Sequence, residues 1–342
     1  MQPGTRTAFL FPGNDIDCKE MLKKTSAEEP FRENFRKVNE LARRLNLTES
    51  NADKSNTNKS NADYSNADNS NTDNSNADNS NADNVDGNFG PAGPELYNQM
   101  LTYAICCSIC DLYKKQNIFP AMVSGYSLGI YSSLYAAEVF SFETGLSIIG
   151  EVFHLVRQFY ESSGRRIMMG AIIGLTEQEI RDLLFKKVSG SLEIACLNGR
   201  RSFVIVGESR AIKDGLDLAQ RLGAMRAVRI NTEFGYHTSL LKESSEKLYA
   251  FLDHCTICEP QCKILSPRDL SLVSKSAIPC EIVKSLYSPV HWESLVNAMI
   301  NIYDIREGYE VGPGESLAKM ARYINQNFKV YPVYTVGSGL EL

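Results

Sequence analysis

Short apolar runs alternate with amphipathic stretches along most of this chain, which is the pattern of an α/β protein. Thr7 to Phe11 and Met122 to Gly125 are short and apolar enough to form buried strands. Helical spacing of apolar residues follows the first strand to about Leu47, covers Glu95 to Lys115, and continues after the second strand to about Ser162. We therefore predict a large domain of the α/β class, built on a parallel sheet.

The pattern changes at about residue 167 and changes back at about residue 232. Between these points the order of predicted elements is β-α-β-β-α-β, which is typical of a ferredoxin-like subdomain. The predicted strands are Met169–Gly174, Leu192–Leu197, Phe203–Gly207 and Met225–Asn231, and the helices are Thr176–Phe185 and Ser209–Leu222. We expect this small subdomain at 167–232 to be inserted into a large domain formed by residues 1–48, 95–166 and 233–342.

Residues 49–94 have a composition unlike the rest of the chain. Ser50 to Asn84 consists of seven pentapeptides of the type Ser-Asn-Ala-Asp-Asn, and a stretch rich in glycine and proline follows to Pro94. The repeats lack the bulky apolar side chains that would be needed to offset the entropy of ordering them. We expect a disordered insertion and linker here, between the first helices and the helix that starts at Glu95.

Composition and charge agree with a soluble enzyme, and we expect it in the cytoplasm. The formal net charge is −5, which argues against a nucleic-acid surface, and no apolar run resembles a signal peptide or a membrane span. Nine cysteines are present, and Cys255, Cys258 and Cys262 follow His254 at a spacing that a metal could use. A metal site usually draws ligands from a second cluster, which the sequence lacks, so we predict no metal and reduced thiols.

The clearest chemical signal is Gly125-Tyr126-Ser127-Leu128-Gly129, which lies between a predicted strand and a predicted helix. In that context the pattern indicates a nucleophile elbow, in which glycines allow a sharp turn and lift the serine hydroxyl to a helix N-terminus. An elbow of this kind favours an α/β-hydrolase-like arrangement of the large domain. Ser127 is therefore the candidate nucleophile.

A serine nucleophile needs a general base, and the chain contains four histidines, of which His154 lies on a predicted helix. His254 is next to a cysteine, and His291 precedes the only tryptophan. His237 follows a strand-like run and precedes a helix, which places it in a loop at a sheet edge. From that position it could reach Ser127 across a cleft.

Six motifs, in order along the chain, resemble those of the malonyl-CoA:acyl carrier protein transacylases, an acyltransferase family of fatty acid and polyketide synthesis. The resemblance extends over the whole length outside the insertion. The matching segments are Ala8–Asn14, Gly125–Ala137, the loop at Asn198, Gly235–Leu241, Leu286–Trp292 and Tyr309–Gly314.

The resemblance implies a role for each of these segments. Ser127 would attack an acyl thioester, and His237 would take its proton and return it to the departing thiol. The backbone carbonyl of His291 would hold the imidazole in place of a carboxylate. The backbone N–H groups of Leu128 and Asn14 would bind the oxyanion.

The same resemblance implies a pocket, a substrate and a partner. Gln99, Tyr126, Asn198 and Tyr236 would line the pocket, in the cleft between the two domains. The substrates would be acyl-CoA or acyl-phosphopantetheine, the partner would be acyl carrier protein, and neither a cofactor nor a membrane would be involved. We expect a monomer.

The chain departs from the family pattern around the proposed oxyanion site and elbow. The first glycine loop has Asn14 where the family has glutamine, and the next residue, Asp15, brings a negative charge. Tyr126 replaces the histidine before the nucleophile, and Ile130 replaces a glutamate after it. We expect the charge of Asp15 to weaken catalysis, and the changes at Tyr126 and Ile130 to alter the pocket wall while leaving Ser127 and His237 in place.

The largest departure concerns the arginine with which malonyl-specific members bind the free carboxylate of the substrate. An ungapped count from Ser127 places Val152 at that position. His154 matches it only if two gap residues are introduced, and Arg157 lies about 140° further around the helix. An unpaired buried carboxylate is costly, so we expect malonyl to be a poor substrate.

Three functions remain open at this point. The first is an acyltransferase that moves an acyl group from CoA or a carrier protein to acyl carrier protein, through an acyl-Ser127 ester. The second is a trans-acting hydrolase of acyl-carrier-protein thioesters, and the third is an inactive scaffold that binds a carrier protein.

Overall fold

The computed structural model describes residues 6–14, 18, 21, 25, 29–44, 93–184, 186, 188, 191–335 and 339–340. The expected disordered insertion lies outside the described residues except for its last two positions, Gly93 and Pro94, which already belong to a helix. Asp15 lies outside the described residues as well.

A six-stranded sheet forms the centre of the larger domain, in the order β10-β9-β8-β1-β2-β7. All pairings are parallel except the one between β10 and β9 at one edge. The strands are β1 Thr7–Phe11, β2 Met122–Gly125, β7 Lys263–Ile264, β8 Glu307–Pro313, β9 Lys329–Thr335 and β10 Gly339–Leu340. The parallel sheet predicted from the sequence is confirmed.

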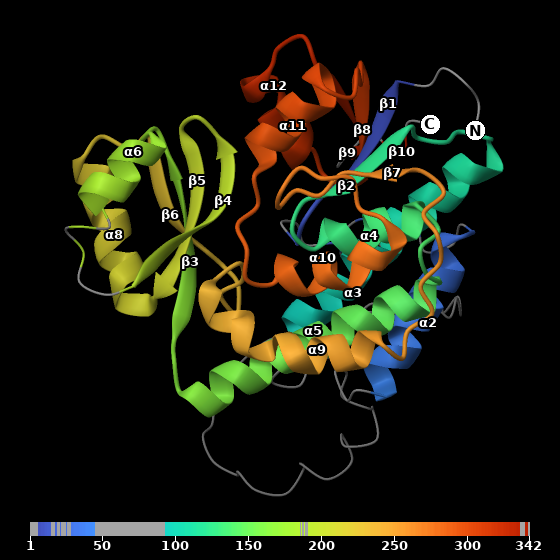
Figure 1. The fold of residues 1–342 in the computed structure, drawn as a ribbon, viewed down its shortest axis with the longest axis horizontal. Helices are drawn as coiled ribbons and strands as arrows, with labels where there is room; N and C mark the ends of the chain where they lie inside the picture. Colours follow the sequence, from blue (N-terminus) through green and yellow to red (C-terminus); the bar gives the residue numbers. More distant parts are fainter. Residues whose placement is uncertain are drawn as a thin grey trace, which may run out of the picture.

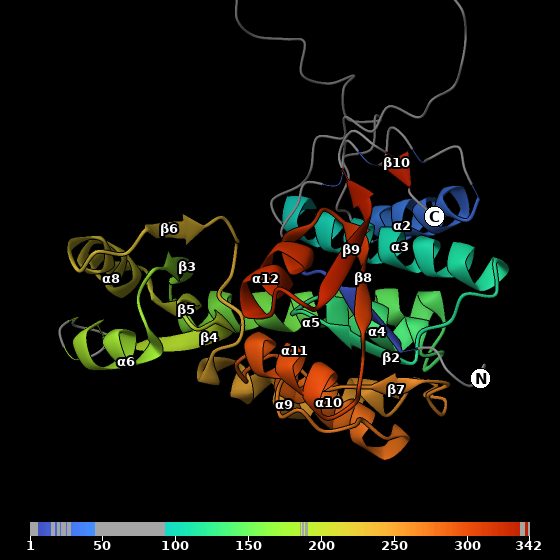
Figure 2. The ribbon, with the colours of Figure 1, turned by 90° about the horizontal axis from the view of Figure 1, so that it is seen from above.

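Helices cover this sheet on both faces (Figures 1 and 2). The α-helices are α2 Phe31–Arg44, α3 Gly93–Lys115, α4 Gly129–Ala136, α5 Phe142–Ser163, α9 Ser245–Leu252, α10 Ile278–Ser285, α11 Trp292–Asn301 and α12 Ser316–Ile324. Two 3-10 turns, η3 Ser239–Ser244 and η4 Lys275–Ala277, precede α9 and α10. Within the described ranges no helix combines the length and the apolar character that crossing a bilayer requires.

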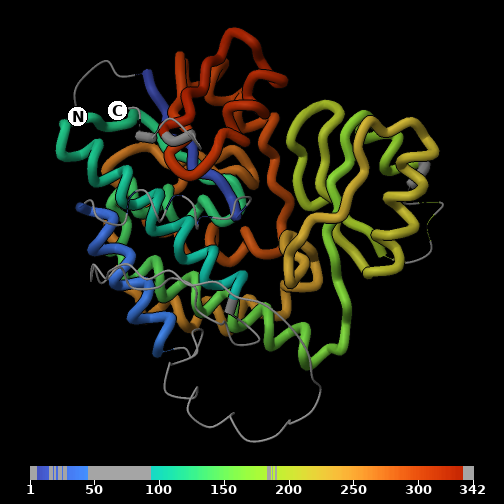
Figure 3. Tube along the Cα trace, turned by 180° about the vertical axis from the view of Figure 1, so that it is seen from behind, coloured from blue at the N-terminus to red at the C-terminus, as the bar shows by residue number. Residues whose placement is uncertain are grey.

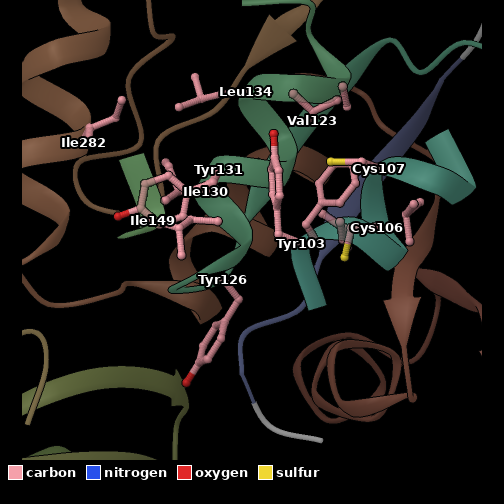
Figure 4. Packing of buried hydrophobic residues seen from close by; sticks show 14 of the residues in the cluster. Tyr103, Cys106, Cys107, Val123, Tyr126, Ile130, Tyr131, Leu134, Ile149 and Ile282 are labelled. Atoms are coloured by element: carbon pink, nitrogen blue, oxygen red, sulfur yellow. The ribbon is translucent and has the colours of Figure 1, made fainter. Parts of the chain in front are cut away.

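The core of this domain is built around the central strands and α3. Trp292, Tyr103 and Phe11 are among the largest side chains that are fully buried. Figure 4 shows side chains from α3, such as Tyr103, beside those of β2 and α4, such as Val123 and Leu134. Cys106, Cys107 and Cys110 of α3 belong to the same cluster, as small buried hydrophobic residues.

The second domain is a four-stranded antiparallel sheet in the order β4-β5-β3-β6, with its helices on one face (Figure 1). Its elements are β3 Ile167–Ile173, α6 Glu177–Glu179, π-helix η2 Ile180–Leu184, β4 Leu192–Gly199, β5 Ser202–Glu208, α8 Ser209–Arg221 and β6 Arg226–Ile230. This order is the predicted ferredoxin-like arrangement, which is therefore confirmed. It has a separate core that includes Ile205 and Ile212.

The two domains meet along β4. Long helix α5 carries the chain from the larger domain to β3 (Figure 3). Cys196 of β4 forms a parallel bridge with Val290, which precedes α11. The Leu197 N–H donates to the Val290 carbonyl at 2.8 Å, and the Val290 N–H donates to the Ala195 carbonyl at 2.9 Å. These contacts place the edge of the small sheet against the segment before α11.

The turn between β2 and α4 packs directly on β1. Phe11 is the register partner of Gly125, and the Phe11 carbonyl accepts the N–H of Tyr126 at 2.9 Å. A Cβ at Gly129 would lie 2.1 Å from that same carbonyl oxygen, and a Cβ at Gly125 would lie 2.0 Å from the carbonyl carbon of Gly129. Only glycine fits at either position.

Replacing Gly129 by alanine should therefore destabilise the fold by at least about 3 kcal/mol, because the new methyl group overlaps backbone atoms that cannot turn aside. The matched control is Gly199→Ala, since a Cβ there would meet only the Ser202 Cβ at 4.0 Å. Chemical denaturation of both variants measures the effect. Equal stability of the two variants would show that the turn can relax.

Candidate functional site

Ser127 is held at the tip of the strand-to-helix turn by the packing of Gly125 and Gly129. Its φ is 52°, in the left-handed region that non-glycine residues rarely adopt. The next residues form the N-terminus of α4, where N–H groups lack partners within the helix. This is the geometry of the nucleophile elbow that the motif predicted.

The structure brings His237 to this serine across 110 residues of sequence. Ser127 Oγ lies 2.8 Å from His237 Nε2. His237 also has a left-handed backbone, with φ at 58°, and its N–H donates to the Leu286 carbonyl at 2.8 Å. Ser127 and His237, called the dyad from here on, are therefore in hydrogen-bond contact.

The other imidazole nitrogen identifies the tautomer. His237 Nδ1 lies 3.2 Å from the carbonyl oxygen of Ser288, which can only accept a hydrogen bond. Nδ1 therefore carries the hydrogen, and the Nε2 lone pair is directed at the Ser127 hydroxyl. In this state Nε2 is ready to accept the serine proton.

The expectation that His291 supplies the orienting carbonyl is wrong, because Ser288, three residues earlier, occupies that place. The His291 carbonyl instead accepts the Leu295 N–H at 2.9 Å, in the first turn of α11. Its N–H donates to the Pro267 carbonyl at 2.7 Å. The backbone of His291 thus forms the N-terminal cap of α11.

Burial keeps the imidazole of His237 uncharged. Removal from water lowers its pKa below the ordinary value of 6.5, and this outweighs the backbone carbonyls of Ser285 and Ser288, which favour the charged form. A lowered pKa leaves the neutral, proton-accepting form dominant at neutral pH.

The loop that carries His237 is braced by the small subdomain. Glu193 of β4 accepts a hydrogen bond from the Thr238 hydroxyl at 2.7 Å. It also accepts from the Ser239 N–H at 2.8 Å and from the Ser239 hydroxyl at 3.0 Å. One carboxylate thus fixes the two residues that follow the histidine.

The proposed oxyanion donors lie at the same end of β1 and β2. In the part of the chain that the structure describes, the Leu128 N–H has no protein acceptor. Asn14 is three residues beyond Phe11 at the end of β1, and its Oδ1 accepts from Nδ2 of Asn98 at 2.6 Å. That bond holds the Asn14 loop against α3.

A pocket opens beside the dyad, and we call it the dyad pocket. Its walls come from α3, the elbow, α4, α5, the His237 loop and the end of α10. The lining residues are Gln99, Ser127, Leu128, Tyr131, Ile149, Val152, Tyr236, His237, Ser285 and Leu286. Gln99, Val152 and Tyr236 thus lie where the sequence analysis expected them. The sequence analysis did not single out Tyr131, Ile149, Ser285 and Leu286. Tyr131 and Leu286 lie within matching motifs, but a motif does not tell which of its helical residues face the pocket.

Three other expected pocket residues do not line it. His154 is exposed, because two helical steps turn it about 200° away from the buried Val152. Tyr126 is buried with its ring edge-on to Trp292 at 5.5 Å between centroids (Figure 4 shows this tyrosine away from Ile149). Asn198 lies in β4, where its buried Oδ1 has no partner among the described residues.

None of the described residues that line the dyad pocket is a lysine or an arginine. Arg157 pairs with Glu161 at 2.8 Å on the outer side of α5. Arg268 lies on a separate small cavity across the dyad, where Asp269 and Glu281 bind it at 2.6 and 3.1 Å. No fixed cation therefore faces the pocket from the described part of the chain.

The cysteine segment at 255–262 does not assemble a metal site. Its three thiols are free, and among the described residues no group of three or more His, Cys, Asp or Glu side chains could hold a metal ion.

Comparison with known proteins gives a consistent set of relatives. The chain is 27% identical over 237 residues to a malonyl CoA-acyl carrier protein transacylase of Bacillus subtilis, covering 68% of this chain and 73% of the relative. It is 31% identical over 204 residues to the enzyme of the same name in Buchnera aphidicola, covering 58% and 65%. No family model matches the chain.

Solved structures share the fold over almost the whole length. One neighbour is a malonyl-transacylase in complex with its type II PKS acyl-carrier protein, with a TM-score of 0.74 and 21% identity. The alignment covers 97% of each chain.

Chemical labelling tests the protonation state of His237. Because its pKa is lowered, the base form persists below pH 6.5, and reactivity should fall only as pH drops through the lowered pKa. The rate of Ser127 modification by a sulfonyl fluoride, measured from about pH 5 to 8, should therefore have its midpoint below 6.5. The exposed-histidine variant His154→Gln should leave that midpoint unchanged. A midpoint above 6.5 in the parent protein would contradict the assignment.

Proposed function

Because this chain belongs to the malonyl-CoA:acyl carrier protein transacylase family of acyltransferases, we propose that it transfers an acyl group to an acyl carrier protein through an ester on Ser127. The observation that carries the proposal is the 2.8 Å contact between Ser127 Oγ and His237 Nε2 at the wall of the dyad pocket. The carrier-protein complex of a structural neighbour supports the choice of partner.

The first half-reaction transfers the acyl group to the enzyme. Ser127 Oγ attacks the thioester carbonyl of acyl-CoA while His237 Nε2 accepts the serine proton. The C–S bond then breaks, and the imidazolium returns this proton to the departing thiolate. The Ser288 carbonyl, which faces Nδ1, stabilises the positive charge while it exists.

The second half-reaction runs the same steps with another thiol. The phosphopantetheine thiol of the carrier protein gives its proton to His237 and attacks the ester carbonyl, and Ser127 Oγ leaves with that proton. In both halves we propose that the Leu128 N–H, at the start of α4, donates to the oxyanion and that the Asn14 N–H is the second donor. This chemistry needs no cofactor.

The dyad pocket is suited to an uncharged acyl group. Leu128, Ile149, Val152 and Leu286 give it apolar walls, and Val152 is buried at the position where the resemblance expects an arginine. A carboxylate there would lose its hydration without gaining a cation. We therefore propose that acetyl-type or longer neutral groups react faster than malonyl.

Mass spectrometry of the intact protein tests the acyl-serine intermediate. Incubation with a panel of acyl-CoAs should add one acyl mass to the parent protein and none to Ser127→Ala, because the alanine has no nucleophile. His237→Ala should slow the addition by several orders of magnitude. An adduct of the same size on Ser127→Ala would refute the assignment. Adding holo acyl carrier protein should move the acyl group to the carrier, whereas release as the free acid would identify a hydrolase.

Introducing an arginine tests the proposed acyl preference. Val152→Arg should raise the ratio of malonyl to acetyl acylation rates by roughly tenfold or more, since a bidentate partner for the carboxylate is built into an apolar wall. Val152→Met controls for side-chain size. A strong preference for malonyl in the parent protein would contradict the proposed neutral substrate.

A further inference from the structure

One end of the dyad pocket is polar, and a half-buried carboxylate lies behind it. Gln99 and Tyr236 line the pocket, and Glu95 lies one turn before Gln99 on α3. Glu95 Oε1 accepts from the Tyr236 hydroxyl at 2.9 Å and from Gln99 Nε2 at 3.2 Å. Its Oε2 accepts the N–H of Glu233. We call Glu95, Gln99 and Tyr236 the Glu95 cluster.

The side-chain hydrogen-bond donors of this cluster are engaged within the cluster. An ionised carboxylate only accepts, so the Tyr236 hydroxyl hydrogen points to Glu95, and the Gln99 NH2 group serves Glu95 and the Tyr236 oxygen, 3.2 Å away. The Gln99 amide oxygen is then the one group of the cluster without a partner in the described part of the chain. The cluster thus offers a ligand an acceptor, with a negative charge behind it.

Glu95 accepts hydrogen bonds, but no lysine or arginine among the described residues forms an ion pair with it. It accepts hydrogen bonds from a phenol, an amide and a backbone N–H. Burial raises the pKa of the Glu95 carboxyl, while these three bonds favour its ionised form. A ligand carboxylate in the dyad pocket would lie several ångströms from the Glu95 carboxylate. In a partly buried setting, repulsion between two negative charges at such a distance weakens binding substantially.

We propose that Glu95, acting through Gln99 and Tyr236, is a specificity-determining group that excludes carboxylated acyl groups from the dyad pocket. Neutral acyl groups escape this repulsion, and one with a hydroxyl group could donate to the Gln99 amide oxygen. The proposal rests on the proposed function, but its cause differs from that of Val152. At Val152 a cation is missing, whereas at Glu95 an anion is present.

Binding in a Ser127→Ala background tests the proposal independently of turnover, because no acyl transfer can occur there. The added change Glu95→Gln keeps the size and removes the charge. The Kd of malonyl-CoA, measured by calorimetry, should fall roughly tenfold, whereas the Kd of acetyl-CoA should stay within about twofold. Glu208→Gln, which removes an exposed charge from the small subdomain, is the matched control and should change neither.

A purely structural role for Glu95 would weaken both ligands together, so equal changes in the two Kd values would overturn the proposal. Glu95→Asp keeps the charge and should keep the discrimination against malonyl-CoA. Discrimination lost in Glu95→Asp as fully as in Glu95→Gln would also overturn it. If Ser127 of the parent protein is never acylated while these binding changes appear, the proposed function fails and the inference stands.

Discussion

The close approach of the elbow to β1 is the constraint on which the rest of the site depends. Two glycines allow the start of α4 to lie against the Phe11 carbonyl, with no room for a Cβ at either. This contact fixes the left-handed backbone of Ser127 and leaves Leu128, whose N–H precedes α4, at the wall of the dyad pocket. Since β1 also pairs with β8, the position of the nucleophile is fixed by the centre of the sheet.

The general base depends on contacts from two other parts of the chain. The segment before α11 supplies the carbonyls of Leu286 and Ser288, and the small subdomain supplies Glu193. The same segment is bridged to β4 through Val290. The orientation of His237 therefore depends on how the two domains dock. A change in their relative position would alter the 2.8 Å distance between Ser127 Oγ and His237 Nε2.

The fold and the dyad could be predicted from the sequence because their signals are local or distinctive. The β-α-β-β-α-β order is visible as changes in the spacing of apolar residues along the sequence. The elbow can be recognised from five residues that lie between a predicted strand and a predicted helix. Ser288 could not be found in this way, since which carbonyl of a loop faces an imidazole depends on tertiary docking. A gap of two residues would align His154 with the arginine position, but two residues along a helix turn a side chain to the opposite face. Glu95 carries no motif, and its role depends on Tyr236, 141 residues away.

In this site the catalytic dyad and the acyl pocket depend on different parts of the chain: the first mainly on backbone atoms, the second on side chains. The dyad is positioned mainly by backbone carbonyls: that of Phe11 under the elbow, that of Leu286 at the His237 N–H and that of Ser288 at Nδ1. The dyad pocket is walled by side chains such as Val152 and Tyr236. Side chains can be substituted without moving the backbone, whereas the elbow tolerates only glycine at two positions. The acyl preference can therefore diverge within a family while the nucleophile and the base keep their geometry.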